Sequence, residues 1–243
     1  MKARWAVILT VIMVLVGSTN LYAGDRFGMG FNYFNSQQNL SGGLEGDLGL
    51  REVNGRVNLN KGFTLQGSYA FGDNRGYINS DLKNTDLSLI RNFIENDRSK
   101  LSLGAGVNQS LFSTDIFGQG LFDIQEQSVN LIGEVEHNLT RHIGLFANYK
   151  YGLLNDYNIS SPNIEVGDLG NFRGDESYSL QAGLSFRVAD DLRANIGYRK
   201  SQGSIQSTSF SSIPIEVNGT TLTDLTNINR STEGLFFGVE TRF

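Results

Sequence analysis

The stretch YSLQAGLSFRVADDLRANIGYR, residues 178–199, decides the fold of this chain. It contains two runs in which bulky and polar side chains alternate, residues 178–186 and 192–198, and a short polar connection joins them. Only a β-strand places successive side chains on opposite faces, so this period of two predicts two neighbouring antiparallel strands. Each predicted strand has one apolar face and one polar face.

The same alternation recurs along most of the chain. Ten segments show it, and we predict a strand in each: residues 27–33, 53–59, 63–71, 85–89, 101–107, 129–135, 143–151, 178–186, 192–198 and 235–243. The 29 glycines and only two prolines also fit many strands joined by polar connections. We therefore predict an all-β fold, a single antiparallel up-and-down barrel of about ten strands, with eight or twelve strands as alternatives.

The placement of aromatic residues separates a transmembrane barrel from a soluble sandwich, which would show the same periodicity. Up-and-down pairing puts four short connections on one side (60–62, 92–100, 137–141 and 189–191) and five long ones on the other (35–47, 72–83, 113–125, 154–177 and 201–232). Phe63, Phe186 and Phe243 then fall near the short connections, whereas Tyr33, Tyr69, Phe71, Tyr149, Tyr151, Tyr178 and Tyr198 fall near the long ones. Two aromatic girdles flanking an apolar band are typical of a transmembrane barrel.

The first residues predict export. Lys2 and Arg4 precede an apolar run, residues 5–16, that is too short to cross a hydrocarbon core of ~30 Å comfortably, and Ala23 offers a small residue for cleavage. We predict a signal peptide in residues 1–23 and a barrel domain in residues 24–243, with a retained anchor as the alternative. An exported barrel implies the bacterial outer membrane, the general secretory route and periplasmic termini.

Charge and cysteine content narrow the partners. Without Lys2 and Arg4 the 20 basic residues fall to 18 against 25 acidic ones, a net charge of −7 that gives no support for nucleic acid as a partner. The chain has no cysteine, so no disulfide stabilises it.

Two segments, residues 136–151 and 234–243, resemble the superfamily of opacity-type and OmpA-like outer-membrane barrels. Many members have eight strands and some carry a peptidoglycan-binding domain, whereas we expect ten strands here and no such domain after Phe243. The ending resembles the strand that barrel-assembly machinery recognises, with alternating Phe237, Val239, Thr241 and Phe243. The resemblance implies that machinery and periplasmic chaperones as partners during biogenesis, and outer-membrane lipid and lipopolysaccharide afterwards.

Catalytic signals are weak. Proton transfer near neutral pH usually needs a histidine, and the only two, His137 and His142, flank a predicted short connection. We predict exposed turn histidines and no enzyme, cofactor or metal site, with a hydrolase as a distant alternative. The oxygen-rich stretch 73–81, with Asp156 and Asp168 in another loop, leaves calcium open, although its spacing does not match an EF-hand.

The polar faces of the predicted strands are expected to line the lumen of the barrel. Its charges are Arg56, Asp86, Glu126, Glu134, Glu136, Lys150, Arg187, Arg193, Arg199, Glu240 and Arg242. Because the signs are nearly balanced, we predict ion pairs that fill the lumen. A water-filled path is the alternative, since several lumen positions are glycine, namely Gly28, Gly30, Gly104, Gly106, Gly144, Gly183, Gly197 and Gly238.

These features predict a structural or surface-interaction protein that acts through its long loops on a ligand that the sequence does not name. The last loop is expected to form a hairpin around Asn218 and Gly219. A narrow passive pore is the alternative function.

Overall fold

The computed structural model describes residues 27–40, 44–59, 62–74, 78–96, 98–116, 122–160, 171–174, 177–206, 215–217, 220–222 and 227–242. The predicted signal peptide, Asp168 and Phe243 lie outside these residues, as do the turn residues Asn218 and Gly219.

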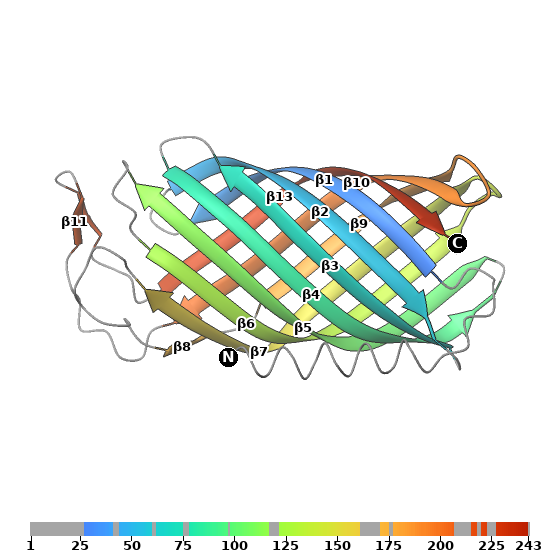
Figure 1. Ribbon diagram of the computed structural model, residues 1–243, viewed down its shortest axis with the longest axis horizontal. Helices are drawn as coiled ribbons and strands as arrows, with labels where there is room; N and C mark the ends of the chain where they lie inside the picture. Colours follow the sequence, from blue (N-terminus) through green and yellow to red (C-terminus); the bar gives the residue numbers. More distant parts are fainter. Residues whose placement is uncertain are drawn as a thin grey trace.

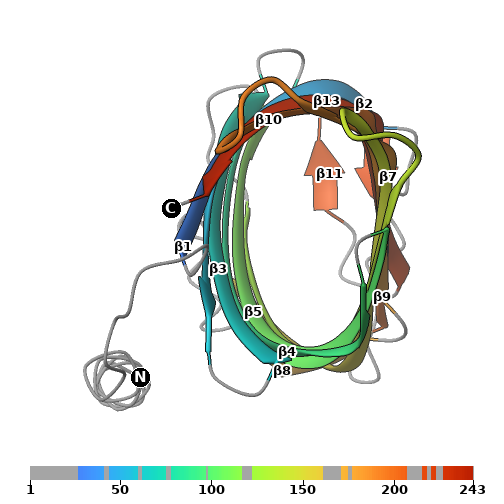
Figure 2. The ribbon, with the colours of Figure 1, turned by 90° about the vertical axis from the view of Figure 1, so that its right-hand side faces the viewer.

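Ten long antiparallel strands form a closed barrel. They are β1 (Phe27–Leu40), β2 (Leu44–Asn58), β3 (Phe63–Asn74), β4 (Ile78–Glu95), β5 (Ser99–Ile116), β6 (Phe122–Asn138), β7 (Ile143–Ser160), β9 (Ser177–Arg187), β10 (Leu192–Gln206) and β13 (Asn227–Arg242). The ring closes where β1 pairs with β13, from Gly28 opposite Arg242 to Leu40 opposite Arg230. Figure 1 shows the strands inclined to the barrel axis, and Figure 2 shows a flattened ring from its end. The predicted architecture and strand number are therefore confirmed.

Three short strands lie at one end of the barrel. β8 (Asn171–Gly174) pairs with β7 and β10, and β11 (Ile215–Val217) pairs with β12 (Thr220–Leu222). Val217 lies opposite Thr220, which confirms the predicted hairpin. Figure 1 shows β11 projecting beyond the barrel, at the end away from the C-terminus.

The opposite end carries the four short connections, and we call it the short-turn end. Local hydrogen bonds shape two of these turns: the Asn96 side chain accepts bonds from the Arg98 and Ser99 amides at 3.0 and 2.8 Å. The Thr140 hydroxyl accepts bonds from the amides of residues 142 and 143. A third turn needs a glycine, because Gly62 adopts a φ of +77° that L side chains rarely tolerate. Polar side chains and glycine thus account for tight turns at this end.

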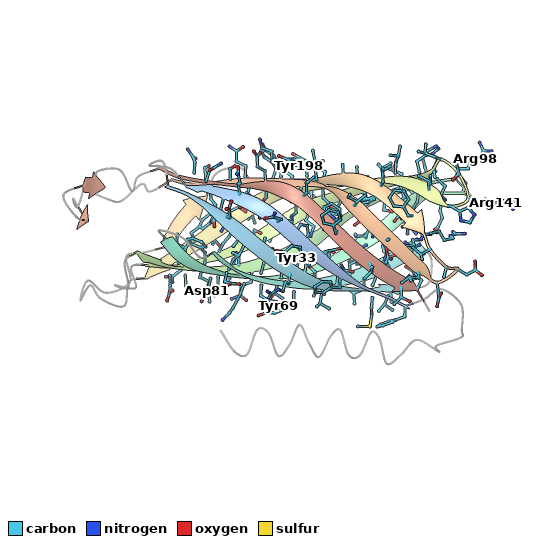
Figure 3. The ribbon with its side chains drawn as sticks, turned by 90° about the horizontal axis from the view of Figure 1, so that it is seen from above. Tyr33, Tyr69, Asp81, Arg98, Arg141 and Tyr198 are labelled. Atoms are coloured by element: carbon cyan, nitrogen blue, oxygen red, sulfur yellow. The ribbon has the colours of Figure 1, made fainter. Side chains whose placement is uncertain are left out.

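The outer face of the barrel carries the predicted apolar belt. On β1, Phe27, Met29, Phe31 and Tyr33 are all more than 40% exposed, whereas the inward-facing Asn32 and Phe34 are buried. Figure 3 shows Tyr33, Tyr69 and Tyr198 at a similar level along the axis, with Arg98 and Arg141 at the short-turn end. This belt, bounded by tyrosines on one side, is the surface of a transmembrane β-barrel. Among the described residues, no helix is long and apolar enough to cross a membrane.

The wall continues beyond the tyrosines, which corrects the prediction of long loops. β4, β5 and β7 each have 18 residues, whereas crossing the hydrocarbon takes about 9–11. We call this part of the wall, on the side of the tyrosines away from the short turns, the rim. Most of the expected loop residues 35–47, 72–83 and 113–125 are strand residues of the rim.

In the rim, the outward side chains are polar, whereas in the belt they are apolar. The rim's outward side chains are polar and exposed, as at Gln37, Asp47, Lys83, Gln127 and Asp156. Its inward side chains include the buried Leu48, Phe112 and Tyr157. Polar side chains outside and several large apolar side chains inside are expected for a wall that water surrounds.

A β-bulge on β7 helps to produce this reversal. Val129 pairs with Leu154 and Asn130 with Gly152, which leaves Leu153 as an extra residue. Leu153 and Leu154 are both exposed, and from there on the inward positions are Asn155 and Tyr157. The extra residue shifts the alternation by one, so that Asp156 faces water and Tyr157 faces the interior.

Candidate functional site: a lumen crossed by ion pairs

Five charged side chains form a network in the lumen near the short-turn end. Glu240 lies 3.2 Å from Arg56 and 3.0 Å from Arg242. Glu136 lies 3.7–3.9 Å from Arg56, Arg193 and Arg242. The five residues come from β2, β6, β10 and β13, so the network ties together strands that are not all neighbours. Opposite charges alternate in it, as the near balance of signs predicted.

Two ion pairs lie farther along the lumen. Arg199 on β10 contacts Glu52 on β2 at 3.2 Å, and the Asn32 amide donates a hydrogen bond to the same carboxylate at 2.9 Å. Lys150 on β7 contacts Asp86 on β4 at 2.9 Å. We call these two pairs the partition. Their carboxylates are largely buried, so each depends on its cation for compensation.

A last ion pair lies inside the rim. Arg230 on β13 contacts Glu126 on β6 at 3.0 Å. Beside it, burial and then the Glu126 carboxylate raise the pKa of the Tyr157 phenol above its ordinary value. The pair is well shielded from water, because the Glu126 side chain is only 8% exposed.

One wall of the lumen is apolar, a feature that the pattern of lumen charges does not indicate. Phe236 packs against Phe34 and Phe146, with ring centroids 5.4 and 5.9 Å away. Leu48 and Leu50 join the same buried cluster. The Arg199 guanidinium lies 4.9 Å from the centre of the Phe34 ring, so the partition rests directly on this wall. The ion pairs of the lumen are therefore accompanied by apolar packing on one side.

Neighbouring side chains pack over several of the lumen glycines. A Cβ on Gly197 would lie 2.6 Å from the Phe236 ring, and one on Gly106 would lie 3.2 Å from the Ile132 side chain. Gly28 is similarly covered by the Arg56 side chain, at 2.8 Å. The space that these glycines leave is occupied by neighbouring residues.

Space remains on both sides of the partition. A cavity of about 210 Å³ lies between the partition and the short-turn network, and one of about 110 Å³ lies between the partition and the Arg230–Glu126 pair. All four residues of the partition line both cavities. The two ion pairs of the partition therefore lie between two cavities.

Most of the predicted lumen charges meet in these contacts. Glu134 contributes through hydrogen bonds from Asn148 at 2.8 Å and Gln66 at 3.3 Å. Arg187 is exposed at the end of β9 and makes no ion pair with the described residues. The prediction missed Glu52 and Arg230, although their parity matches Arg56 and Glu240, because the alternation was not followed far enough along these strands.

The other predicted residues lie away from the lumen contacts. Phe237 and Val239 are exposed on the outer face of β13, and Thr241 shares their parity. Both histidines are exposed at the short-turn end, where His137 Nδ1 lies 2.8 Å from the Ser99 hydroxyl. No group of three His, Asp or Glu side chains in the described ranges is arranged to hold a metal ion.

Comparison with known proteins supports the fold alone. A scan against models of protein families finds no match, and a search of curated proteins finds none. Among solved structures, the outer membrane protease OmpT from Escherichia coli matches with a TM-score of 0.59 and 10% identity, over 93% of this chain and 99% of that one. The translocator domain of autotransporter NalP from Neisseria meningitidis matches with a TM-score of 0.52 and 12% identity, over 100% of this chain and 97% of that one. These likenesses do not single out the opacity-type branch; the chain has the fold of bacterial outer-membrane β-barrels.

Proposed function

We propose that this chain is a closed, non-enzymatic barrel of the bacterial outer membrane whose rim presents binding surfaces outside the cell. The observation that carries the proposal is the rim. A membrane anchor needs no packed wall beyond the tyrosines, yet here that wall is built with buried Leu48, Phe112 and Tyr157. A rigid rim can hold the β11–β12 hairpin and its outward polar side chains at a fixed distance from the membrane.

The signs of the lumen charges support a closed state. A selective pore is expected to present a ring of one sign to the passing ion. Here cations and carboxylates alternate at three levels, from the Glu136 and Glu240 network through the partition to Arg230 and Glu126. The side chains therefore satisfy one another.

Export through the general secretory route, with both termini in the periplasm, belongs to the same proposal. Because the only tryptophan is Trp5, a barrel processed after residue 23 should show no tryptophan emission. Persistent emission would show that the leader is retained.

Orientation is tested with single cysteines, since the chain has none of its own. A membrane-impermeant maleimide added to intact cells should label Asp81→Cys on the rim and leave Arg141→Cys at the short-turn end unlabelled. In permeabilised cells, both cysteines should be labelled. The reverse pattern would overturn the proposed orientation.

Closure is tested in planar bilayers. Wild-type protein should show no steady conductance, whereas replacing all four residues of the partition by serine should merge the two cavities and open a leak. As a matched control, serine at both members of the exposed Lys200–Glu233 pair on the outer wall should leave the barrel closed. A steady wild-type conductance would contradict this part of the proposal.

The surface role is tested by removing the hairpin. Cells carrying the wild-type barrel should adhere to one another, or to surfaces coated with fibronectin, laminin or collagen, more than cells in which residues 207–226 are replaced by Asn-Gly. Equal adhesion on every surface would leave only a structural role.

A narrow passive pore is the second candidate, and the two cavities favour it, since only the partition separates them. A small wild-type conductance whose ion preference changes in Arg199→Ala would support the pore. A hydrolase ranks third, because both histidines lie at the short-turn end, away from the rim.

A further inference from the structure

The outer wall carries a row of alternating aromatic and basic side chains at the base of the rim. Tyr33 on β1 lies opposite Arg51 on β2, Arg51 opposite Phe71 on β3, and Phe71 opposite Lys83 on β4. All four side chains are exposed. The row thus runs across four neighbouring strands on the membrane side of the wall.

The level of this row places it among lipid headgroups. Tyr33 lies with Tyr69 and Tyr198 at the edge of the apolar belt, and Asp81, two residues before Lys83, lies nearer the β11 end (Figure 3). Along β2 and β4, Arg51 and Lys83 are the first charged outward positions beyond the belt residues Val53 and Leu87. Amphipathic aromatics favour the headgroup level, and cations just beyond them meet the lipid phosphates.

Both cations lack a carboxylate partner among the described residues. The Arg51 guanidinium lies 6.0 Å from the centre of the Phe71 ring, and Lys83 makes no ion pair with a described side chain. Lys200, on the outer wall of β10, is instead paired with Glu233 at 3.3 Å. Unpaired cations that face headgroups call for anions supplied by the lipid.

The spacing suits one phosphate held by both cations. Strands lie ~4.8 Å apart, so the Cα atoms of Arg51 and Lys83 are separated by about 10 Å, with Phe71 between them. Two long side chains can converge over the ring across such a gap, and guanidinium and ammonium groups both bind phosphate strongly.

We propose that Tyr33, Arg51, Phe71 and Lys83 form a binding site for the phosphorylated glycolipid of the outer leaflet, lipopolysaccharide, through a lipid A phosphate. The aromatic rings contact the upper acyl chains and sugar, while the two cations bind the phosphate. The inference rests on the proposed outer-membrane location and orientation, and it gives the rim a lipid-bound base.

The test measures binding of diphosphoryl lipid A to the purified barrel in detergent, by native mass spectrometry with EDTA present. Arg51→Gln and Lys83→Gln should each weaken binding roughly fivefold, and the double variant roughly thirtyfold. Dephosphorylated lipid A should bind wild type and double variant equally. Lys200→Gln and Arg91→Gln are the matched controls, because one removes a paired cation and the other a cation near the short-turn end.

Competition experiments distinguish lipid A from other sources of phosphate. Millimolar inorganic phosphate and phosphatidylglycerol should not displace lipid A from the wild type; displacement by either would show that the site is not specific for the glycolipid. Unchanged affinity of the double variant, or equal losses with dephosphorylated lipid A, would overturn the site. Loss of surface labelling at Asp81→Cys in the wild-type background would instead refute the proposed orientation.

Discussion

Lys150 Nζ lies 2.9 Å from Asp86 Oδ2 inside the barrel, and the two residues belong to β7 and β4, which are not neighbours in the sheet. The Asp86 side chain is 8% exposed and the Lys150 side chain 28%. This pair therefore links separate parts of the wall through the lumen, and it closes the partition together with Arg199 and Glu52.

Asp86→Ala should destabilise the barrel. The substitution leaves the Lys150 ammonium inside the lumen without its carboxylate, and we expect a loss of about 1–3 kcal/mol in the free energy of unfolding, since Lys150 is partly hydrated. The urea midpoint, read from the different migration of folded and unfolded protein in SDS, measures the change. Asp86→Ala with Lys150→Met should recover part of the loss; a double variant as unstable as their summed single losses would show that the pair is not coupled.

Gly197→Ala should lower folding yield and stability by about 1–3 kcal/mol. The added methyl would lie 2.6 Å from the Phe236 ring and 2.9 Å from the Gly183 Cα, and backbone cannot move aside cheaply. Gly133→Ala is the control, because its Cβ would meet nothing nearer than the Leu103 side chain at 3.6 Å. Equal refolding yields of the two variants in detergent would contradict the packing of Phe236 against Gly197.

Deletion of Leu153 should remove the bulge and leave the end of β7 facing as it does now. Without the extra residue Leu154 follows Gly152 directly, so the ladder with β6 becomes regular, Asp156 still faces water and Tyr157 still faces the interior. A cysteine at position 156 should therefore react readily with an aqueous maleimide in both the full chain and the deletion variant. Slow labelling in the deletion variant alone would show that Leu153 is not the extra residue.

Deletion of Phe243 should reduce the amount of barrel in the outer membrane and increase its degradation in the periplasm, if the last strand is the assembly signal that its alternation resembles. His137→Ala serves as the control, since that side chain is exposed near a turn and lies 2.8 Å from the Ser99 hydroxyl. Immunoblots of membrane and periplasmic fractions measure both. Unchanged outer-membrane levels after the deletion would refute the signal.

The sequence was sufficient to predict the belt but not the rim. Alternation over residues such as Phe27 to Tyr33 survives in the structure, because lipid on one side and a crowded lumen on the other impose a period of two. Beyond the tyrosines the sense of the alternation reverses, so strands such as residues 78–84 looked like polar loops. Leu153 adds a second difficulty, since a bulge changes parity without a distinctive residue type.

The sequence predicts which charged side chains face the lumen, but it does not predict which of them pair with one another. Arg56, Glu136 and Glu240 were assigned to the interior correctly, but which carboxylate meets which cation depends on strand tilt and register. Glu52 and Arg230 could have been found by continuing the same alternation by a few residues. The apolar wall around Phe34 and Phe236 has even parity in the sequence, yet only the packing of three rings distinguishes it from scattered lumen residues.

The seam between β1 and β13 has a consequence for the order of folding. Gly28 and Arg242 are among the most distant residues in the described chain, yet they pair side by side, so closure is the contact with the largest sequence separation. Every other long strand lies next to a strand close to it in sequence and can form a hairpin early. Until synthesis and export reach the last strand, β1 keeps an unpaired edge open to other chains. A chain truncated before β13 is thus left with two free edges and a strong tendency to associate with its own copies.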